Sequence, residues 1–195
     1  VIFGAGAQAG RNWPQSARCA RSAGRRCSTR TGVRDREFCQ RMEAELGVEV
    51  RASRDVQSAI EHAEIICTAT NAATSLFNGE WLQPGAHVNA IGAYTAHMRE
   101  LDAATVARSR IFVDHHPAAQ TEAGDILLAI ADGAIAYDHV AGELGDVLTG
   151  KIPGRQREDE ITVFKSVGLA MQDAVTVARV YARAREAGMG HEVAL

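Results

Sequence analysis

A short run of small residues near the beginning of the chain is the first pattern that could do chemistry. Gly4-Ala5-Gly6-Ala7-Gln8-Ala9 follows the strand-favouring segment Val1-Ile2-Phe3. In the pattern G-x-G-x-x-A, the first glycine permits a tight turn, the second lets the backbone approach a pyrophosphate, and the small last residue lets a helix pack on the strand. The N–H groups at the start of that helix would hold the phosphates. The pattern predicts a dinucleotide site, and a purely structural turn is the alternative.

Polar side chains also stand at the ends of four later segments that are rich in apolar, strand-favouring residues. In a parallel sheet, ligands bind at the carboxyl ends of the strands. We therefore expect these polar residues and the glycine turn to lie along one edge of a sheet. They are Thr70 and Asn71, then Tyr94, then Asp114 to His116, and finally the Lys165-Ser166 turn.

Two clusters of ionisable residues look like metal or acid–base sites but have simpler explanations. Asp114, His115 and His116 are consecutive, and consecutive strand residues point to opposite faces. We therefore predict a turn with solvated histidines and no metal site. Glu122 and Asp125 form an E-x-x-D pattern, which we interpret as surface or helix-start residues and not as a catalytic pair.

From residue 36 onward, the hydrophobic pattern predicts short helices that alternate with short strands. Phe38, Met42 and Leu46 lie on one face of a helix that ends at Gly47. Asp55 is placed to cap a second helix, which we expect to end near residue 61. Further helices are predicted at 103–108 and from residue 170 to about 181. The predicted strands are 1–3, 48–50, 65–70, 87–92, 111–114 and 161–164.

This alternation predicts an α/β fold with a Rossmann-like, doubly wound, mostly parallel sheet, followed by a long C-terminal helix. We assign residues 1–166 to the dinucleotide-binding domain and residues 167–195 to the final helix and tail. Ala170, Ala174 and Val177 give that helix one apolar face. A chain of 195 residues is long enough to bury one good core.

The composition excludes several classes of protein. Hydrophobic residues make up 46% of the chain and charged residues 23%, which is ordinary for a soluble globular protein. No apolar run approaches the roughly 18 residues of a membrane span, and no signal peptide is evident. The 4 cysteines show no C-x-x-C pairing, which favours a reduced, cytoplasmic protein. The net charge of -3 argues against a general nucleic-acid partner.

The first part of the chain has an unusual composition. No acidic residue precedes Asp35 although seven arginines occur there, and no Val, Ile, Leu, Phe or Met stands between Phe3 and Val33. Three explanations are open. They are a basic arm for nucleic acid, which lacks an aromatic platform, a cofactor-phosphate site that uses one or two arginines, and a local reading-frame error. Pro14 inside the expected first helix would break its hydrogen-bond ladder and supports the third explanation.

Six segments taken together resemble the ornithine cyclodeaminase/mu-crystallin family in their order and spacing. This resemblance covers most of residues 36–190 and is far more specific than the glycine turn alone. The segments are G-A-G-A-Q-A at Gly4, I-I-C-T-A-T-N at Ile65, H-V-N-A-I-G-A-Y-T-A-H-M-R-E-L-D at His87, E-A-G-D-I-L at Glu122, G-E-L-G-D-V-L-T-G-K-I-P-G-R at Gly142, and I-T-V-F-K-S-V-G-L-A-M-Q-D at Ile161.

The resemblance implies a Rossmann domain that binds NAD(P), joined to an N-terminal half for substrate binding and dimerisation. Members cyclise ornithine to proline, oxidise or reduce amino and imino acids, reduce cyclic ketimines, or bind NADPH and a small ligand without catalysis. The enzymes share hydride transfer between nicotinamide and a carbon that bears nitrogen. The expected partners are a small amino- or imino-acid substrate and, at full length, a second copy in a homodimer. No nucleic acid or membrane is expected.

The resemblance also assigns the cofactor-binding residues one by one. Thr70 and Asn71 match a strand end that touches the cofactor, with hydrogen bonding inside their own loop as the alternative. Val88 to Ile91 match a strand beside the nicotinamide ribose. Ser166 matches a serine that faces the nicotinamide carboxamide, and a helix N-cap is its alternative role. The predicted set is Gly4, Gly6, Ala7, Gln8, Arg30, Thr31, Thr70, Asn71, Val88, Asn89, Ala90, Ile91 and Ser166.

Arg30 and Thr31 bear on the choice of cofactor. Thr29-Arg30-Thr31 resembles the end of the second strand in members that bind NADPH, and its distance from Gly4 fits the family spacing. No acidic residue stands there to bond a ribose 2′-hydroxyl, whereas a guanidinium can pair with a 2′-phosphate through two hydrogen bonds. We therefore predict NAD(P)(H) as the cofactor, with NADP(H) preferred.

The chain departs from the family pattern at Tyr94 and Met98. Cyclodeaminase and alanine dehydrogenase members carry Asp and Lys at these two positions, and the Asp acts as acid or base near the substrate. A phenol is protonated at neutral pH, so Tyr94 cannot replace a carboxylate base but could donate a proton or hydrogen bond to an imine nitrogen. We predict Tyr94 as a catalytic residue, with a role limited to lining the pocket as the alternative.

This change at Tyr94 favours reduction of a cyclic ketimine or imino acid, such as pyrroline-2-carboxylate. An ornithine cyclodeaminase and a non-catalytic binder of NADPH and a small ligand are the alternatives. In the family, the catalytic Lys and the carboxylate-binding Arg belong to the N-terminal half, which we expect to lie outside this sequence. Neither Lys151 nor Lys165 is assigned to that role, so we expect the full-length protein to be active and this chain alone to be inactive.

Overall fold

The computed structural model of the protein describes residues 1–4, 25–28, 32–47, 49–191 and 193. These residues build one eight-stranded sheet in which every pair of neighbouring strands is parallel. The strands are β1 (Ile2–Phe3), β2 (Arg25–Ser28), β3 (Val50–Ala52), β4 (Ile65–Thr68), β5 (His87–Ala90), β6 (Arg110–Val113), β7 (Val140–Glu143) and β8 (Thr162–Lys165).

The order of the strands is β3-β2-β1-β4-β5-β8-β6-β7. From β1 the chain winds outward through β2 to β3, and β4 then pairs with the other side of β1. This reversal is the topological switch point of a doubly wound sheet, where ligands bind in α/β proteins. The predicted Rossmann-like fold with a parallel sheet and a long C-terminal helix is confirmed.

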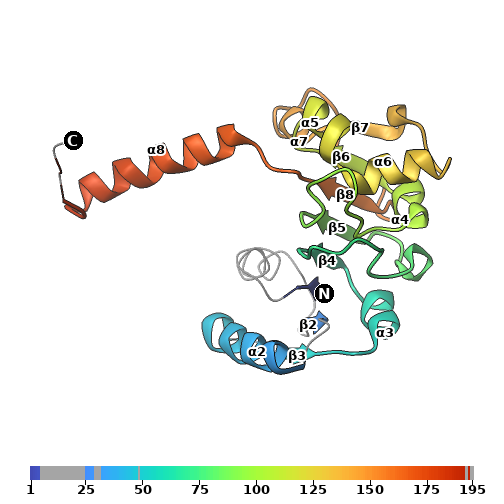
Figure 1. Cartoon of the computed structure of the whole chain (residues 1–195), viewed down its shortest axis with the longest axis horizontal. Helices are drawn as coiled ribbons and strands as arrows, with labels where there is room; N and C mark the ends of the chain where they lie inside the picture. Colours follow the sequence, from blue (N-terminus) through green and yellow to red (C-terminus); the bar gives the residue numbers. More distant parts are fainter. Residues whose placement is uncertain (5–24, 29–31, 48, 192, 194–195) are drawn as a thin grey trace.

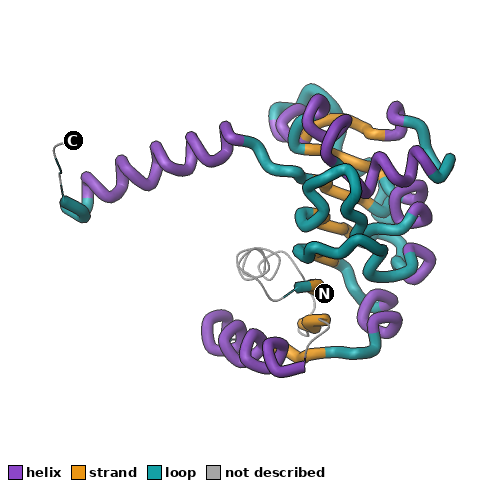
Figure 2. Tube along the Cα trace, in the orientation of Figure 1, coloured by secondary structure: helices purple, strands orange, loops and turns teal. Residues whose placement is uncertain are grey.

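Helices cover both faces of the sheet. In Figures 1 and 2, α3, α4 and α6 lie along one side of the strands, while α2 lies on the other side. The helices are α2 (Gly32–Leu46), α3 (Val56–Glu61), α4 (Ala103–Arg108), α5 (His116–Glu122), α6 (Gly124–Ala131), α7 (Leu144–Leu148) and α8 (Ala170–Glu186), with short 3-10 helices η1 (Gly79–Trp81) and η2 (Tyr137–His139).

Local signals explain where several helices begin and end. The helix predicted to end at Gly47 does so, since α2 ends at Leu46 and Gly47 adopts a left-handed φ of 63°. The predicted cap of α3 is also confirmed, because the Asp55 carboxylate accepts a hydrogen bond from the Ser58 N–H at 3.0 Å. Asp102 caps α4 in the same way through the Thr105 N–H.

Strand β7 and the helices α5, α6 and α7 have no counterpart among the predicted elements. Val140 is the one β-branched residue of β7, so its sequence lacks the alternating pattern of a strand. The pairing of β7 with β6 is also irregular, with a register shift between Ile111 and Phe112. The strand forms at the edge of the sheet because β6 presents it with a row of backbone N–H and C=O groups.

The buried side chains form two clusters that share β1. Ile2 packs in the smaller cluster with Phe38 and Met42 of α2. The adjacent Phe3 belongs to the larger cluster, where its ring stacks on Phe77 with the ring centroids 5.5 Å apart. Successive strand residues point to opposite faces of a sheet, so two residues of β1 are enough to anchor both layers.

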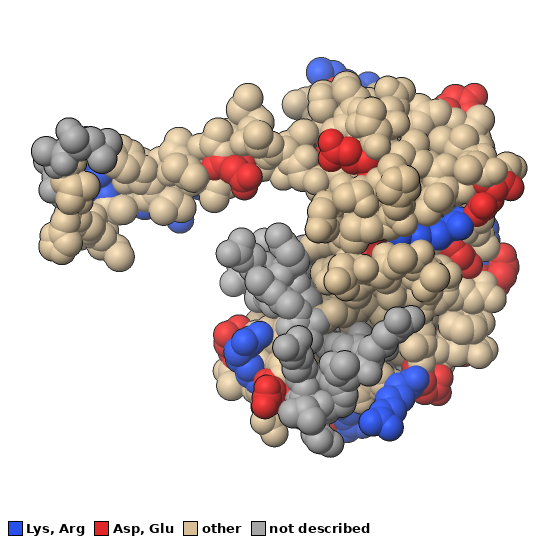
Figure 3. All heavy atoms as spheres, in the orientation of Figure 1, with Lys and Arg blue, Asp and Glu red and all other residues tan. Residues whose placement is uncertain are grey.

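Helix α8 extends away from the sheet and has no buried residue. The space-filling view shows it as an arm with few charged side chains on the visible face (Figure 3). The helix is formed as predicted, and its apolar side chains remain exposed within the described chain. The large ones are Met171, Val175, Val177, Val180 and Tyr181. The predicted division of the chain at residue 166 falls between β8 and this helix and stays a prediction.

Candidate active site

The ends of β1, β4, β5 and β8 meet at the carboxyl edge of the sheet. Gly4, directly after β1, has a φ of 106°, and a Cβ atom added to it would lie 2.6 Å from the Ala69 carbonyl oxygen that follows β4. Only glycine fits this left-handed conformation at so close an approach. The first glycine of the G-x-G-x-x-A pattern therefore sits at the switch point between β1 and β4, where the pattern requires it.

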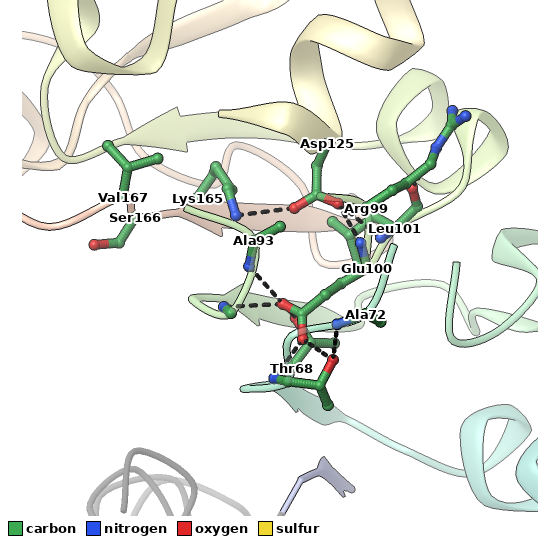
Figure 4. A network of polar contacts seen from close by, with 12 residues as sticks. Thr68, Ala72, Ala93, Arg99, Glu100, Leu101, Asp125, Lys165, Ser166 and Val167 are labelled. Carbon is green, nitrogen blue, oxygen red and sulfur yellow. Dashed lines mark hydrogen bonds and ion pairs between the residues drawn. The ribbon is translucent and has the colours of Figure 1, made fainter. Parts of the chain in front are cut away.

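A buried carboxylate joins the turns that follow β4 and β5. Glu100 has no exposed surface, and its Oε1 accepts hydrogen bonds from the Thr70 N–H at 2.6 Å and the Thr70 hydroxyl at 2.7 Å. Its Oε2 accepts from the Thr68 hydroxyl at 2.8 Å, the Gly92 N–H at 2.9 Å and the Ala93 N–H at 3.2 Å. Figure 4 shows the Glu100 side chain reaching down between these two turns. The carboxylate thus fixes both strand ends.

A buried ion pair continues this network to the end of β8. Asp125 Oδ2 lies 2.9 Å from Lys165 Nζ, and both side chains are 1% exposed. Asp125 Oδ1 accepts the backbone N–H groups of Glu100 at 2.7 Å and Leu101 at 2.9 Å. The interpretation of Asp125 as a helix-start residue is confirmed, because it lies in the first turn of α6. Its interpretation as a surface residue is wrong, because the negative charge pairs with Lys165 inside the protein (Figure 4).

Asp114, at the end of β6, organises the turn that leads out of β8. Its Oδ2 accepts hydrogen bonds from the Ser166 hydroxyl at 2.7 Å, the Val167 N–H at 3.0 Å and the Gly168 N–H at 2.9 Å. Ser166 Oγ also accepts the Gly168 N–H at 3.2 Å. Ser166 is not a helix N-cap, because α8 begins at Ala170 and Leu169 occupies the capping position without a side-chain bond.

Thr70 and Asn71 differ in their surroundings. The Thr70 hydroxyl donates to Glu100 and accepts the Ala72 N–H at 3.2 Å. Asn71 is exposed at the start of the loop after β4. The structure thus gives Thr70 hydrogen bonds within its own loop and toward Glu100, while Asn71 is exposed.

The segment Val88–Ile91 lies in and just beyond β5. Val88 and Ala90 are fully buried in the larger core cluster. The Asn89 amide donates to Cys67 Sγ at 3.7 Å and its oxygen faces His87 Nε2 at 3.3 Å, so that side chain is engaged next to β4. The Ile91 N–H donates to the Thr68 carbonyl at 3.0 Å, which ties the end of β5 to the end of β4.

Tyr94 stands in the loop after β5 with 56% of its surface exposed. It follows directly on Ala93, whose N–H is bonded to Glu100, so the backbone leading to the phenol is anchored while the ring is accessible. Met98, in the same loop, is half-buried. The remaining predicted residues, Gly6, Ala7, Gln8, Arg30 and Thr31, lie outside the described residues.

The turn at Asp114-His115-His116 is held by Glu143 at the end of β7. Glu143 Oε1 accepts the His116 N–H at 2.8 Å and lies 3.1 Å from His115 Nδ1. The bond from the His116 backbone N–H lowers the pKa of Glu143, and a hydrogen bond with the His115 side chain lowers it further. Within the part of the chain that the structure describes, no group of three or more His, Cys, Asp or Glu residues could hold a metal ion.

Glu100 and Asp125 were not among the predicted site residues, and Lys165 was expected at the carboxyl edge without a role in the site. A signal for Lys165's buried partner was available, because this cation ends a strand segment in which Ile161, Val163 and Phe164 are apolar. Charged residues are almost never fully buried unless they are paired, so a lysine there requires a buried anion. Glu100 offered no comparable signal, because it lies between Arg99 and Leu101 in a loop whose contacts are distant in sequence.

A family model described as the ornithine cyclodeaminase/mu-crystallin family matches residues 1–188. The chain belongs to this family. Among curated proteins, it is 36% identical over 165 residues to a delta(1)-pyrroline-2-carboxylate reductase of Bacillus cereus, which covers 84% of this chain and 50% of that protein. It is 38% identical over 148 residues to the ketimine reductase mu-crystallin of Mus musculus, which covers 76% of this chain and 44% of the relative.

A solved structure supports the same assignment. The delta(1)-pyrroline-2-carboxylate reductase of Thermococcus litoralis, in complex with NADH and L-proline, superposes with a TM-score of 0.94 at 33% identity. The match covers 98% of this chain and 59% of that one. The chain thus spans about half the length of the curated relatives that it matches. In the described part of the chain, no helix has both the length and the apolar character needed to cross a membrane.

Proposed function

We propose that the natural protein carrying this sequence is an NAD(P)-dependent reductase of cyclic imino acids, with pyrroline-2-carboxylate as the expected substrate. The observation that carries the proposal is the arrangement of the carboxyl edge. Gly4, the turn at Thr70, the loop to Tyr94 and the turn at Ser166 follow four neighbouring strands at the switch point of the sheet. The similarity to pyrroline-2-carboxylate and ketimine reductases supports this choice of reaction.

The described residues fit a dinucleotide. Gly4 has a left-handed φ and no room for a side chain beside the Ala69 carbonyl, as the first glycine of the pattern requires for its tight turn. When bound, the reduced nicotinamide would supply the hydride that the imine carbon accepts. Gly4, Gly6, Ala7 and Gln8 would hold the pyrophosphate, with Thr70, Asn71 and the segment Val88–Ile91 beside the ribose and nicotinamide.

Ser166 would orient the nicotinamide carboxamide. Its hydroxyl hydrogen is committed to Asp114 at 2.7 Å, and one lone pair receives the Gly168 N–H. A hydroxyl has one hydrogen and two lone pairs, so Ser166 retains one lone pair. It would therefore accept a hydrogen bond from the carboxamide NH₂ and would not donate to the carboxamide oxygen.

Tyr94 would serve as the proton donor to the imine nitrogen. Its phenol is exposed, and the backbone before it is fixed through the Ala93 N–H. Hydride addition to the imine carbon places an electron pair on nitrogen, and a proton from the phenol or from a water that the phenol orients completes the amine. Tyr94→Phe should lower kcat for imine reduction with little change in dinucleotide affinity, whereas a phenol that only lines the pocket would change KM instead.

The reaction is tested with the complete natural protein. Reduction of pyrroline-2-carboxylate is followed as loss of NADPH or NADH absorbance, in parallel with ammonia release from ornithine in the presence of NAD. Imine reduction without ornithine turnover supports the proposal. Ammonia release would instead identify an ornithine cyclodeaminase, and dinucleotide binding without either reaction would identify a non-catalytic binder.

We further propose that NADP(H) is the preferred cofactor, because Arg30 could pair with a 2′-phosphate. Titrations with NADPH and NADH test this preference. Arg30→Ala should reduce the affinity for NADPH and leave the affinity for NADH almost unchanged. Equal affinities in the unchanged protein would contradict the preference.

We also propose a cytoplasmic homodimer as the working form of the complete protein. The exposed apolar side chains of α8, among them Val177 and Tyr181 one turn apart, support an assembly that covers this helix, because exposed apolar surface marks contact sites. Light scattering on the complete protein tests the dimer. Val177→Asp combined with Tyr181→Asp on α8 should weaken the dimer, and a monomer in the unchanged protein would refute it.

A further inference from the structure

We propose that Glu100 is the positioning residue for the nicotinamide side of the site, because its buried carboxylate holds the turns after β4 and β5 in the shape that receives the dinucleotide. This role rests on the proposed function, since it presupposes that a dinucleotide binds at the carboxyl edge. Glu100 has no exposed surface. It would therefore act through its neighbours and not by touching the ligand.

The two oxygens of Glu100 divide the work between both turns. Among the described residues, Oε1 accepts hydrogen bonds from Thr70 alone, through its N–H and its hydroxyl. Oε2 binds the Gly92 and Ala93 N–H groups after β5, and also the Thr68 hydroxyl at the end of β4. One carboxylate thus sets the distance between the two turns, although Glu100 itself lies 30 residues from Thr70 and 8 residues from Gly92 in the sequence.

The backbone of both turns depends on this acceptor. The Thr70, Gly92 and Ala93 N–H groups follow the last residues of β4 and β5, and each donates to Glu100. A buried N–H that loses its acceptor costs about 1–3 kcal/mol. Without the carboxylate these turns would rearrange to find other partners, and the loop that carries Tyr94 would move with them.

The backbone at Gly92 is packed so closely against Thr70 and Glu100 that it leaves no room for a side chain. A Cβ atom on Gly92 would lie 2.3 Å from the Thr70 carbonyl oxygen and 2.4 Å from Glu100 Oε1. The glycine therefore admits the carboxylate and both turns at once. A different side chain at position 92 would displace the groups that Glu100 brings together.

The backbone of Glu100 is itself fixed by hydrogen bonds. Its N–H donates to Asp125 Oδ1 at 2.7 Å, and its carbonyl accepts the Leu76 N–H at 2.9 Å. The Asp125 carboxylate is fixed by Lys165 at the end of β8. Glu100, Asp125 and Lys165 consequently connect the ends of β4, β5 and β8, as Figure 4 shows, and we expect this unit to be rigid. This rigidity is what a positioning residue requires.

The experiment compares Glu100→Gln with Asp102→Asn. Glutamine keeps the shape of Glu100, but its NH₂ group faces donors in place of one oxygen. Asp102 also accepts two backbone N–H bonds, from Thr105 at 2.8 Å and Gly79 at 2.9 Å, but it caps α4 and bonds neither turn. Both substitutions should lower the unfolding midpoint. NADPH and NADH affinities are then measured by calorimetry, well below both midpoints.

We expect Glu100→Gln to bind NADPH and NADH roughly tenfold to a hundredfold more weakly than the unchanged chain, and Asp102→Asn to bind them normally. Equal dinucleotide affinities for the unchanged protein, Glu100→Gln and Asp102→Asn would overturn the positioning role of Glu100 and leave the proposed function standing. Failure of the complete, unsubstituted protein to bind either dinucleotide would overturn the proposed function and this role with it.

If Glu100→Gln does not fold, the hydroxyl of Thr68 offers a milder test. Thr68→Val removes one of the donors to Oε2 and preserves the side-chain volume, whereas Thr68→Ser retains the hydroxyl. Weaker NADPH binding by the valine variant, restored by the serine variant, supports the role. Unchanged binding by the valine variant contradicts it.

Discussion

The two edges of the sheet use side chains of opposite charge to bind the backbone groups at the strand ends. At the carboxyl edge, the N–H groups of Thr70, Gly92 and Ala93 converge on the fully buried Glu100. At the amino end of β5, the Gly85 carbonyl accepts a hydrogen bond from the exposed guanidinium of Arg155 at 2.6 Å, and the Ala86 carbonyl accepts one from Arg155 at 3.4 Å in addition to the Thr162 N–H at 3.0 Å. A buried anion serves the edge that carries the site, and an exposed cation serves the other.

The two edges differ in whether water can replace a hydrogen-bond partner that is lost. Water can reach the carbonyls at the amino edge if Arg155 leaves, because that arginine is exposed. Glu100, Asp125 and Lys165 are each at most 1% exposed, so water cannot readily replace a partner that one of them loses. The carboxyl edge is therefore expected to be rigid and sensitive to substitution, and the amino edge tolerant.

The largest effect is expected at Lys165. Lys165→Met leaves Asp125 buried without its counter-charge, which should lower the free energy of unfolding by about 3–5 kcal/mol. Urea denaturation measures this loss. Lys151→Met is the matched control, because Lys151 pairs with Asp146 at the surface and is 70% exposed, so its midpoint should hardly change. Similar midpoints for both variants would contradict the buried pair.

The next largest effect is expected at Gly92. Gly92→Ala forces a Cβ atom against Thr70 and Glu100 and should cost about 1–3 kcal/mol of unfolding free energy, as overpacking does. Gly145→Ala in α7 provides the control, because no atom lies within 4 Å of its added Cβ. That variant should be as stable as the parent or slightly more stable. Thermal unfolding of the two variants decides, and a tolerated Gly92→Ala would show that the carboxyl edge can relax.

A smaller, pH-dependent effect is expected at the amino edge, where burial lowers the pKa of His87 below its ordinary value of 6.5 and the charge of Arg155 contributes to the same direction. The unfolded chain then binds a proton more readily than the folded one. Stability should be greatest above pH 6.5 and fall as the pH drops toward the lowered pKa of the folded state.

Denaturation midpoints at a series of pH values measure this dependence. His87→Asn should flatten the profile in this range, while His62→Asn, at an exposed position, should leave it unchanged. A profile that is equally steep with and without His87 would assign the pH dependence to another group.

The smallest effect is expected for Arg155→Gln. The substitution removes bonds to Gly85, Ala86 and the Thr162 hydroxyl, but solvent can replace them, so the loss should be about 0.5–1.5 kcal/mol. Dinucleotide affinity should not change, because the residue lies at the far edge from the site. An affinity loss as large as that of Glu100→Gln would remove the distinction between the two edges.

Local patterns were enough to predict much of the architecture. The Asp55 cap located α3, and local residue patterns located α4 and the cores of β4, β5, β6 and β8, because these signals act within a few residues. The edge strand β7 was missed because its residues V-A-G-E have little intrinsic strand preference. Its pairing with β6 supplies the stabilisation that its own sequence lacks.

The candidate site also has features that the sequence predicts and features that only the tertiary structure shows. The sequence by itself determined the family, the glycine turn at Gly4, the strand ends that carry Thr70 and Ser166, and the unusual tyrosine at position 94. Only the tertiary structure decided that Glu100 joins the turns after β4 and β5, that Asp125 pairs with Lys165 in the interior, and that Asp114 holds the turn at Ser166. These contacts join residues far apart in the chain, and their strength comes from burial, which no local pattern encodes.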